Sequence, residues 1–259
     1  MEFIGYRNQN RRKNSRSPIR KMQKLNIFIR SAIFNIMFLI ASIIFSISAL
    51  LMLFMPSIYT LKVAKIWSKS SLWLLKHICH LDYKITGLEN IPQNTHVVFA
   101  SKHQSAWETV AYQTFLYPSV FMFKKELAFI PLFGIALLKA KNIPINRGHA
   151  NKGMIKDLTN KFKDRLQNQN IIIFPEGTRT KPNTPANYKS GLSLITENIK
   201  TFVVPIAMNS GIYWPKKSFL KYPGTIQVHI LPPIETGSMS HLDFQKKFVG
   251  IVEDEMKRL

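Results

Sequence analysis

The stretch His96–Val110, HVVFASKHQSAWETV, joins a short apolar run to a polar turn and then to a helix-like segment. The apolar residues at 97–100 are typical of a buried strand. His103 follows in the turn, and Glu108 comes five residues later. A carboxylate held against one imidazole nitrogen fixes the tautomer and leaves the other nitrogen free to accept a proton. If the two side chains work together, the protein is an enzyme.

Ser105 and Glu108 also match a capping box, in which a serine caps a helix and a glutamate returns to the serine amide. In that alternative Glu108 is purely structural. His103 lies outside the box, and the polar turn SKHQS gives no packing reason for a histidine. Capping and orientation of the imidazole are compatible, so both interpretations stay open.

Short apolar runs alternate with helix-like stretches from about residue 82 onward. This alternation predicts an α/β domain with a largely parallel central sheet flanked by helices. Strands are expected at 83–86, 97–100, 120–123, 143–145, 171–174, 202–207 and 225–231, and helices near 106–116, 127–139, 151–168, 188–199 and 240–257. In such folds the chemistry gathers in loops at the carboxyl ends of the strands.

Those loops contain the unusual polar residues. KKE (124–126), NRG (146–148) and PEGTR (175–179) each follow a predicted strand, as does His103. One edge of the sheet therefore collects a histidine, carboxylates and several cations, which suits an anionic substrate brought to a base. Each motif alone has a plain structural explanation, such as a Pro-Glu-Gly turn beside a solvated arginine, so the prediction depends on their order.

The chain has 259 residues, and its 36 Lys and Arg outnumber 14 Asp and Glu, which gives a net charge of +22. Such a charge favours anionic partners: lipid headgroups, phosphorylated substrates or nucleic acid. Cys79 is the only cysteine, which excludes an intramolecular disulfide and a zinc site built on paired thiolates. The histidines show no zinc-type spacing. A non-catalytic protein that binds membrane surfaces or nucleic acid is a remote alternative, since no aromatic-interleaved basic motif is present.

The N-terminal part predicts a membrane element. Residues 1–30 form a basic arm with nine Lys or Arg against the single acid Glu2, and residues 31–61 carry no charge. A helix over 31–55 would be about 37 Å long, enough to cross a bilayer core of about 30 Å. Residues 56–80 mix lysines and aromatics, as interfacial helices do. We expect a helical hairpin over 31–80 that returns to the same leaflet, followed by the α/β domain over 81–259. A single crossing predicts the same hydropathy, and a signal peptide is a weaker alternative.

Five sequence blocks, taken in order, resemble a known family. His103 with its acid, FKKELAFIPLFG, INRG, FPEGTRT and VVPIA are similar to the four-block pattern of the glycerolipid acyltransferases, specifically the bacterial 1-acyl-glycerol-3-phosphate acyltransferases. The resemblance covers about residues 80–235, and the hydrophobic N-terminal element is similar as well. The family usually has aspartate at the position of Glu108, which puts the geometry in question more than the role.

The resemblance implies transfer of an acyl chain from acyl-CoA or acyl carrier protein to the sn-2 hydroxyl of lysophosphatidate (1-acyl-glycerol 3-phosphate), which forms phosphatidate. Glycerol 3-phosphate or another lysophospholipid is the alternative acceptor. It implies His103 as catalytic base and Glu108 as its support, with residues 127–138 lining the acyl chain. The substrate-binding residues would be Lys125, Arg147, Glu176, Gly177, Thr178 and Arg179. Neither a cofactor nor a metal is expected, and nucleic acid is not an expected partner. The catalytic domain would lie on the cytoplasmic face of a bacterial inner membrane, with anionic lipids as further partners.

Overall fold

The computed structural model describes residues 18–146, 151–184 and 186–259. An eight-stranded sheet lies at its centre, in the order β1-β7-β6-β2-β5-β3-β4, with β8 paired to β6. Most neighbouring strands are parallel, and β6 runs antiparallel to both β7 and β8. The predicted α/β fold with a largely parallel sheet is therefore confirmed.

The elements follow the predicted alternation closely. The strands are β1 Leu81–Thr86, β2 Val98–Ser101, β3 Ser119–Lys124, β4 Ile143–Ile145, β5 Asn170–Ile173, β6 Phe202–Met208, β7 Gly224–Ile230 and β8 Ile234–Glu235. The α-helices are α1 Pro18–Leu51, α2 Ser57–Cys79, α3 Trp107–Phe115, α4 Phe133–Lys139, α5 Lys152–Arg165, α6 Gly191–Thr196, α7 Ser210–Tyr213 and α8 His241–Met256. The described residues also form two 3-10 helices, η1 Leu88–Asn90 and η2 Lys125–Phe129. The short elements α7 and β8 were not predicted, because two to four residues show no periodicity.

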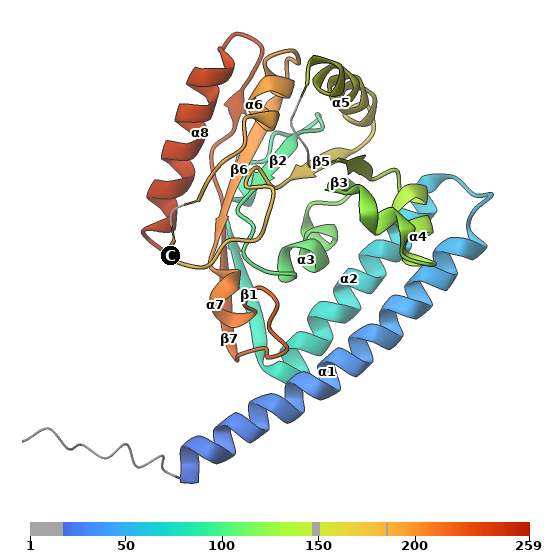
Figure 1. Ribbon diagram of the computed structural model, residues 1–259, viewed down its shortest axis with the longest axis vertical. Coiled ribbons are helices and arrows are strands. Elements are labelled where there is room, and N and C mark those ends of the chain that lie inside the picture. Colours follow the sequence, from blue (N-terminus) through green and yellow to red (C-terminus); the bar gives the residue numbers. More distant parts are fainter. Residues whose placement is uncertain (1–17, 147–150, 185) are drawn as a thin grey trace, which may run out of the picture.

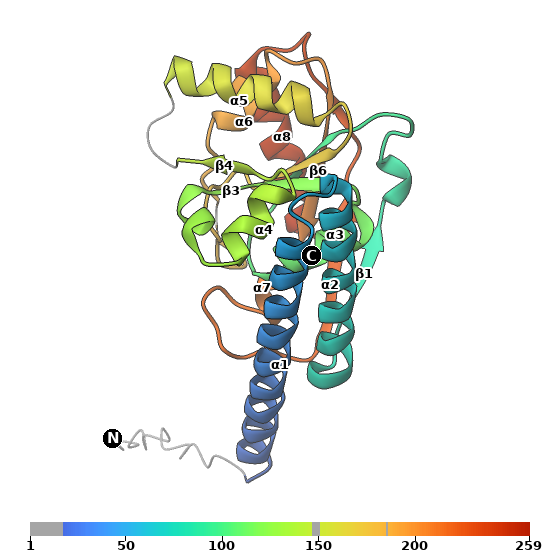
Figure 2. The ribbon, with the colours of Figure 1, turned by 90° about the vertical axis from the view of Figure 1, so that its right-hand side faces the viewer.

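Helices cover both faces of the sheet (Figures 1 and 2). Phe99 on β2 packs in a cluster with residues of α1, α2 and α3, whereas its neighbours Val98 and Ala100 pack in a cluster with residues of α5, α6 and α8. All three side chains are fully buried. A strand covered on both faces reads as a continuous apolar run, which is why HVVFA was recognisable in the sequence.

The predicted helix over 127–139 is wrong in its first half. The chain forms η2, turns at Pro131, and begins α4 only at Phe133. Leu132 adopts a positive φ of 61°, outside the helical region. A Cβ at Gly134 would lie 2.0 Å from the carbonyl oxygen of Ala128, so only glycine permits this close return of the chain. The apolar periodicity of the sequence concealed the turn.

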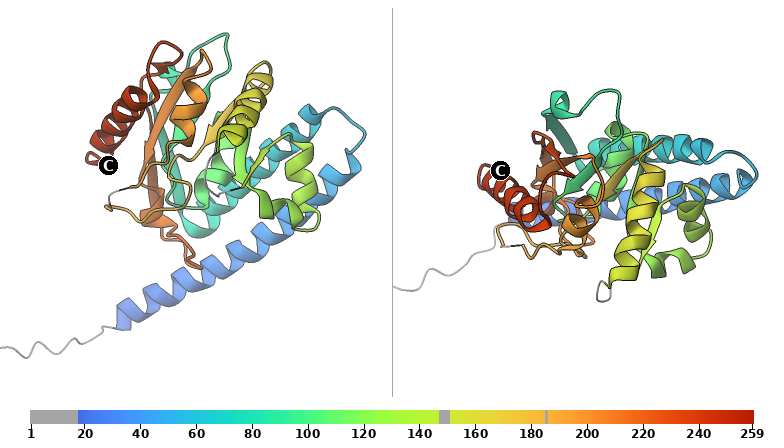
Figure 3. Two further views of the ribbon diagram at one scale, coloured as in Figure 1. Left: turned by 45° about the horizontal axis from the view of Figure 1, so that its top comes forward. Right: turned by 90° about the horizontal axis from the view of Figure 1, so that it is seen from above.

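The N-terminal helices α1 and α2 lie side by side and pack against the α/β body (Figure 3). Trp67 of α2 contacts the rings of Phe38 and Phe45 of α1, each at 5.5 Å between centroids. Ser68, the next residue of α2, donates a 2.5 Å hydrogen bond to the carbonyl of Val110 in α3. We call the pair α1–α2 the bracket. Its second helix is hydrogen-bonded to α3, the helix that carries Glu108.

The outward side of α1 is apolar. Its segment Met22–Leu51 is long and apolar enough to cross a membrane by length and composition. Large hydrophobic side chains remain exposed along it, among them Leu25, Phe28, Ile36, Ile40 and Ile44. Helix α1 begins at Pro18, so residues 18–30 of the predicted arm are helical, and residues 1–17 lie outside the described residues. The division into arm, hairpin and α/β domain stays a prediction.

Residues 214–223, the strap, connect α7 to β7 and bind α1. Lys221 is 3% exposed, and its ammonium donates to Asn35 of α1 and lies 4.7 Å from the ring centre of Trp214. The amide of Lys221 donates to the hydroxyl of Ser31, also on α1, over 2.9 Å. Burial lowers the pKa of Lys221 to about 8. These contacts hold the N-terminal half of α1 against the body.

Candidate active site

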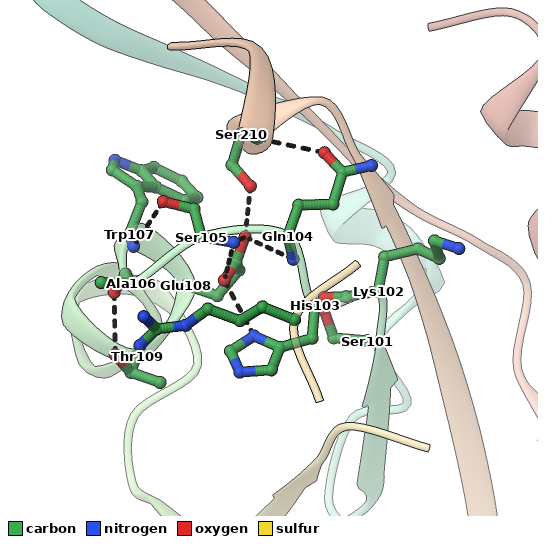
Figure 4. Close-up of polar contacts among 12 residues, drawn as sticks. Ser101, Lys102, His103, Gln104, Ser105, Ala106, Trp107, Glu108, Thr109 and Ser210 are labelled. Carbon is green, nitrogen blue, oxygen red and sulfur yellow. Dashed lines mark hydrogen bonds and ion pairs between the residues drawn. The ribbon is translucent and has the colours of Figure 1, made fainter. Parts of the chain in front are cut away.

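His103 lies in the turn between β2 and α3, at the carboxyl edge of the sheet (Figure 4). Glu108 occupies the first turn of α3 and folds back toward it. The imidazole Nδ1 is 3.1 Å from the carboxylate Oε2 of Glu108. His103 is 7% exposed and Glu108 is fully buried. The structure therefore brings together the two residues that the sequence singled out.

The carboxylate of Glu108 also accepts hydrogen bonds from the α3 turn and from a distant element. The amide of Ser105 donates to it over 3.0 Å, the amide of Gln104 over 3.3 Å, and the hydroxyl of Ser210 donates to Oε1. The hydroxyl of Ser105 accepts from Trp107 rather than from Glu108, so only the glutamate half of the capping box forms. Glu108 thus caps the turn and contacts the imidazole at once.

The contact with Glu108 favours one tautomer of His103. A carboxylate oxygen accepts a hydrogen bond from the tautomer that carries its proton on Nδ1, and in this tautomer Nε2 is the acceptor. The ring of Phe174, at the end of β5, stacks on the imidazole with centroids 4.0 Å apart and planes 17° apart. The imidazole is therefore held in its plane and presents one basic nitrogen.

Glu176 fastens the loop after β5 to the turn that holds His103. Its buried carboxylate lies 3.1 Å from the ammonium of Lys102 and accepts a 2.9 Å hydrogen bond from the hydroxyl of Thr180. The amide of Thr180 donates to the carbonyl of His103 over 2.7 Å. Burial raises the pKa of Glu176, and the nearby Lys102 charge opposes that rise. Glu176 thus orders the loop that carries Gly177, Thr178 and Arg179.

A cavity of about 500 Å³, the first cavity, extends from His103 to the bracket α1–α2. Its polar end holds His103 and cationic or hydroxyl side chains: Lys124, Thr178, Arg179, Lys216 and Lys217. Its other end is apolar and is lined by Phe45, Leu61 and Trp67 of the bracket and by Phe133, Ala136 and Leu137 of α4. The cavity therefore suits an anionic group beside His103 and a long apolar chain toward the bracket.

The predicted substrate-binding residues are distributed unevenly around this cavity. Thr178 and Arg179 line it, whereas Glu176 and Gly177 do not. Gly177 adopts a positive φ of 66° in the turn that precedes Thr178. Lys125 is exposed at the start of η2, while its neighbour Lys124 lines the cavity. Arg147 lies outside the described residues.

Ser210 and Lys216 belong to the site but were missed in the sequence. The ammonium of Lys216 donates to the carbonyl of Arg179 over 2.6 Å and to the hydroxyl of Thr178 over 3.2 Å. Ser210 binds Glu108 across 102 positions of sequence. Neither residue belongs to a recognisable motif, so no local signal could have found them.

Comparisons with known proteins agree with this geometry. The family model described as Acyltransferase matches residues 82–209, a segment that contains His103, Glu108 and the loop of Arg179. The chain is 39% identical over 171 residues to a Pseudomonas aeruginosa protein named 1-acyl-sn-glycerol-3-phosphate acyltransferase, and the alignment spans 66% of each chain. A Borreliella burgdorferi protein of the same name is 25% identical over 190 residues, or 73% of this chain and 74% of that protein.

A solved structure shares the fold. The 1-acyl-sn-glycerophosphate (LPA) acyltransferase PlsC from Thermotoga maritima matches with a TM-score of 0.76 over 92% of this chain and 99% of that one, at 20% identity. This match includes the helical bracket, since so little of the chain is left out. The structural match shows the shared fold. The sequence matches over the site show that the chain belongs to the acyltransferase family.

Proposed function

We propose that this chain transfers an acyl chain from a thioester donor to the sn-2 hydroxyl of 1-acyl-glycerol 3-phosphate and so forms phosphatidate. The donor would be acyl-CoA or acyl carrier protein. The observation that carries the proposal is the placement of the buried His103–Glu108 pair at the cationic end of a cavity whose far end is apolar. The names of the bacterial relatives support the same acceptor.

In this mechanism His103 acts as the general base. Its Nε2 takes the proton of the acceptor hydroxyl while the hydroxyl oxygen attacks the thioester carbon. A new carbon–oxygen bond forms, the carbon–sulfur bond breaks, and the imidazolium returns its proton to the leaving thiolate. Glu108, which contacts Nδ1 at 3.1 Å, stabilises the imidazolium while it exists. The steps balance without a covalent acyl-enzyme or a cofactor.

The acceptor phosphate would bind at the cationic end of the first cavity. Arg179 is suited to it because a guanidinium can donate to two phosphate oxygens at once. Lys216 supports this site by binding the carbonyl of Arg179 and the hydroxyl of Thr178. Lys125 and Arg147 remain predicted contacts to the same phosphate.

The acyl chain of the donor would occupy the apolar end of the first cavity. Leu127, Phe133 and Leu137 from the predicted acyl-lining segment contribute to its wall, and the bracket α1–α2 closes it. Burying one methylene group contributes about 0.8 kcal/mol, so a long chain binds strongly in such a site.

We also propose where the enzyme works. The exposed apolar side of α1 would enter one leaflet of the bacterial inner membrane, and the α/β domain would lie on its cytoplasmic face. The lysines and aromatics exposed on α2, such as Lys69 and Trp73, suit the headgroup region. The basic arm would bind anionic lipids at about 1 kcal/mol per nearby cation.

The decisive experiment compares wild type with His103→Ala in an acyl-transfer assay. A labelled acyl thioester is offered with lysophosphatidate, glycerol 3-phosphate or lysophosphatidylcholine as the acceptor. We expect transfer to lysophosphatidate and a loss of about 10² to 10⁴ in kcat in the variant, the usual contribution of a general base. His229→Ala is the matched control, because His229 forms a 2.5 Å contact to Glu255 away from the cavity.

Each outcome of this assay has a distinct meaning. Transfer to a different acceptor would keep the chemistry and replace the substrate. A fully active His103→Ala variant would overturn the mechanism. A loss of activity in His229→Ala as large as in His103→Ala would show that the assay reports folding rather than catalysis.

A further inference from the structure

A second cavity, of about 600 Å³, lies on the opposite face of the sheet from the first. Its apolar wall comes from β4, α5, β5 and α6 and includes Ile145, Ile155, Leu158, Ile173, Leu192 and Ile195. The helices that line the first cavity are instead α1, α2, α3 and α4. Figure 2 shows α4 and α5 on opposite sides of β3 and β4. The mechanism described above leaves this second cavity unused.

The two cavities adjoin beside the imidazole. Met122, Phe174 and Thr178 line both of them. Phe174 is also the ring that stacks on His103 at 4.0 Å. A molecule that occupies both cavities would therefore pass the catalytic histidine at the point where the cavities adjoin.

A thioester donor has the shape that such an arrangement requires. Its acyl chain leaves the reacting carbon on one side, and a pantetheine arm leaves the sulfur on the other side. Acyl-CoA and acyl carrier protein both carry this arm, which contains amides and a hydroxyl and ends in a phosphate. A cavity of 600 Å³ lies within the usual range for small-molecule sites, roughly 300 to 1,000 Å³.

We infer that the second cavity binds the pantetheine arm of the donor. The acyl chain then occupies the first cavity, and the thioester carbon lies at the junction beside His103. The inference rests on the proposed acyl-transfer function and adds to it a binding site for the donor. The two arms of one donor thus explain why two cavities adjoin at one histidine.

The polar groups of the second cavity fit this occupant. Asn146, Thr178, Lys189 and Ser190 line it and offer donors and acceptors to the amides of the arm. Lys189 is exposed at the cavity, where it can meet the phosphate that ends the arm. A wall that is otherwise apolar suits the methylene groups between the amides.

The surroundings of the second cavity favour an anionic, water-soluble donor. Helix α5, which supplies part of the wall, carries five Lys or Arg and two Asp, a net charge of +3. One of the acids, Asp157, is paired with Lys161 at 2.7 Å. Helices α1 and α2, which carry the apolar membrane side, cover the other face of the sheet. The donor therefore approaches from the face that the membrane element leaves uncovered.

Gly191 offers a direct test. It lines the second cavity, and a Cβ built on it meets no atom within 4 Å, so Gly191→Leu adds a bulky side chain at the cavity wall without a clash at Cβ. Gly250 on α8 is equally open and lies on an exposed surface, so Gly250→Leu is the matched control. We expect Gly191→Leu to raise the KM for palmitoyl-CoA about tenfold, or about 1.4 kcal/mol. The KM for lysophosphatidate and the preference for acyl-chain length should not change, and Gly250→Leu should change none of these quantities.

The same kinetics are measured with palmitoyl carrier protein as the donor. Because the arm is shared, its KM should rise alongside that for palmitoyl-CoA. A rise for palmitoyl-CoA alone would assign the cavity to the nucleotide and overturn the inference. A changed chain-length preference would assign the cavity to the acyl chain, and a raised KM for lysophosphatidate would assign it to the acceptor; either result also overturns it.

A binding measurement separates this inference from the proposed function. A thioether analogue of palmitoyl-CoA, which cannot transfer its acyl chain, is titrated into the full chain in lipid vesicles by calorimetry. We expect binding about tenfold weaker in Gly191→Leu than in wild type and Gly250→Leu. If wild type binds the analogue but transfers no acyl chain to lysophosphatidate, only the proposed function fails. If Gly191→Leu does not fold, Ile155→Phe fills the cavity from α5, and equal affinities in the folded variants overturn the inference.

Discussion

Two buried glutamates, Glu108 and Glu176, lie close to His103 and are stabilised in different ways. Glu108 is bound by backbone amides, by the Ser210 hydroxyl and by the imidazole itself. Glu176 is bound by the Lys102 ammonium and the Thr180 hydroxyl. Both side chains are nearly or fully buried, at 0% and 2% exposure.

This difference indicates that Glu108 supports catalysis, whereas Glu176 stabilises the structure. Lys102 neutralises the charge of Glu176, and this buried ion pair joins two loops. Glu108 is held mainly by dipoles, which stabilise a charge without cancelling it. The negative charge of Glu108 therefore stays available to the imidazolium. The four predictions below test this contrast, in order of decreasing effect on kcat.

The largest effect is expected from Glu108→Gln. Glutamine keeps a carbonyl oxygen for the α3 turn but loses the charge that faces His103. We expect kcat to fall by roughly 10² while the melting temperature stays close to that of wild type. Glu197→Gln is the control, because Glu197 contacts His241 at 3.2 Å on the exposed surface. An unchanged kcat in a folded Glu108→Gln enzyme would show that Glu108 is only a helix cap.

Ser210→Ala should have the next effect. It removes the hydroxyl that binds Oε1 of Glu108 and leaves that oxygen held only by the amides of Gln104 and Ser105, so the carboxylate is positioned less firmly against the imidazole. We expect kcat to fall about tenfold, about 1.4 kcal/mol, with the KM for lysophosphatidate unchanged and partial rescue by Ser210→Thr. Ser71→Ala is the control, since this buried serine donates within α2 to the carbonyl of Trp67. Equal kcat losses in the two variants would indicate a general loss of stability.

Glu176→Gln should affect stability more than catalysis. Lys102 keeps its second partner, Glu253 at 3.0 Å, so the variant folds. The weakened loop attachment should lower the free energy of unfolding by roughly 1 to 3 kcal/mol, raise the KM for lysophosphatidate, and lower kcat less than about threefold. Chemical denaturation and steady-state kinetics measure these quantities. A loss of kcat as large as in Glu108→Gln would contradict the contrast.

The smallest effect concerns pH and leaves kcat unchanged. Burial raises the pKa of Glu176, so between its ordinary value and the raised value the folded state holds a proton that the unfolded chain has lost. The free energy of unfolding should therefore fall as pH rises through this window. Denaturation at a series of pH values should show a slope that is more negative in wild type than in Glu176→Gln. Identical slopes would show that the Glu176 pKa is the same in both states.

The sheet and most helices could be predicted because strands covered on both faces leave continuous apolar runs, as in residues 97–100. The turn at Pro131 could not, because apolar residues continue through it at helical spacing. Only the positive φ of Leu132 and the close approach at Gly134 show why the helix is interrupted. Local spacing therefore defined the elements but not this interruption.

The local half of the site was likewise predictable, and the distant half was not. His103 and Glu108 share one turn, so their contact follows from sequence spacing. Ser210 lies on α7 and Lys216 on the strap, and both contact the site only in the folded chain. No sequence motif indicates these contacts. The assignment of Glu176 to loop ordering likewise depended on Lys102, which precedes it by 74 positions.

The strap links lipid contact to phosphate binding mechanically. Lys221 and Ser31 bind it to α1, and five residues earlier Lys216 supports the loop of Arg179. Detergents that pull α1 away from the body would therefore also loosen the phosphate site. An enzyme purified in this way would lose affinity for its acceptor before it lost its catalytic pair, and returning it to a bilayer should restore that affinity.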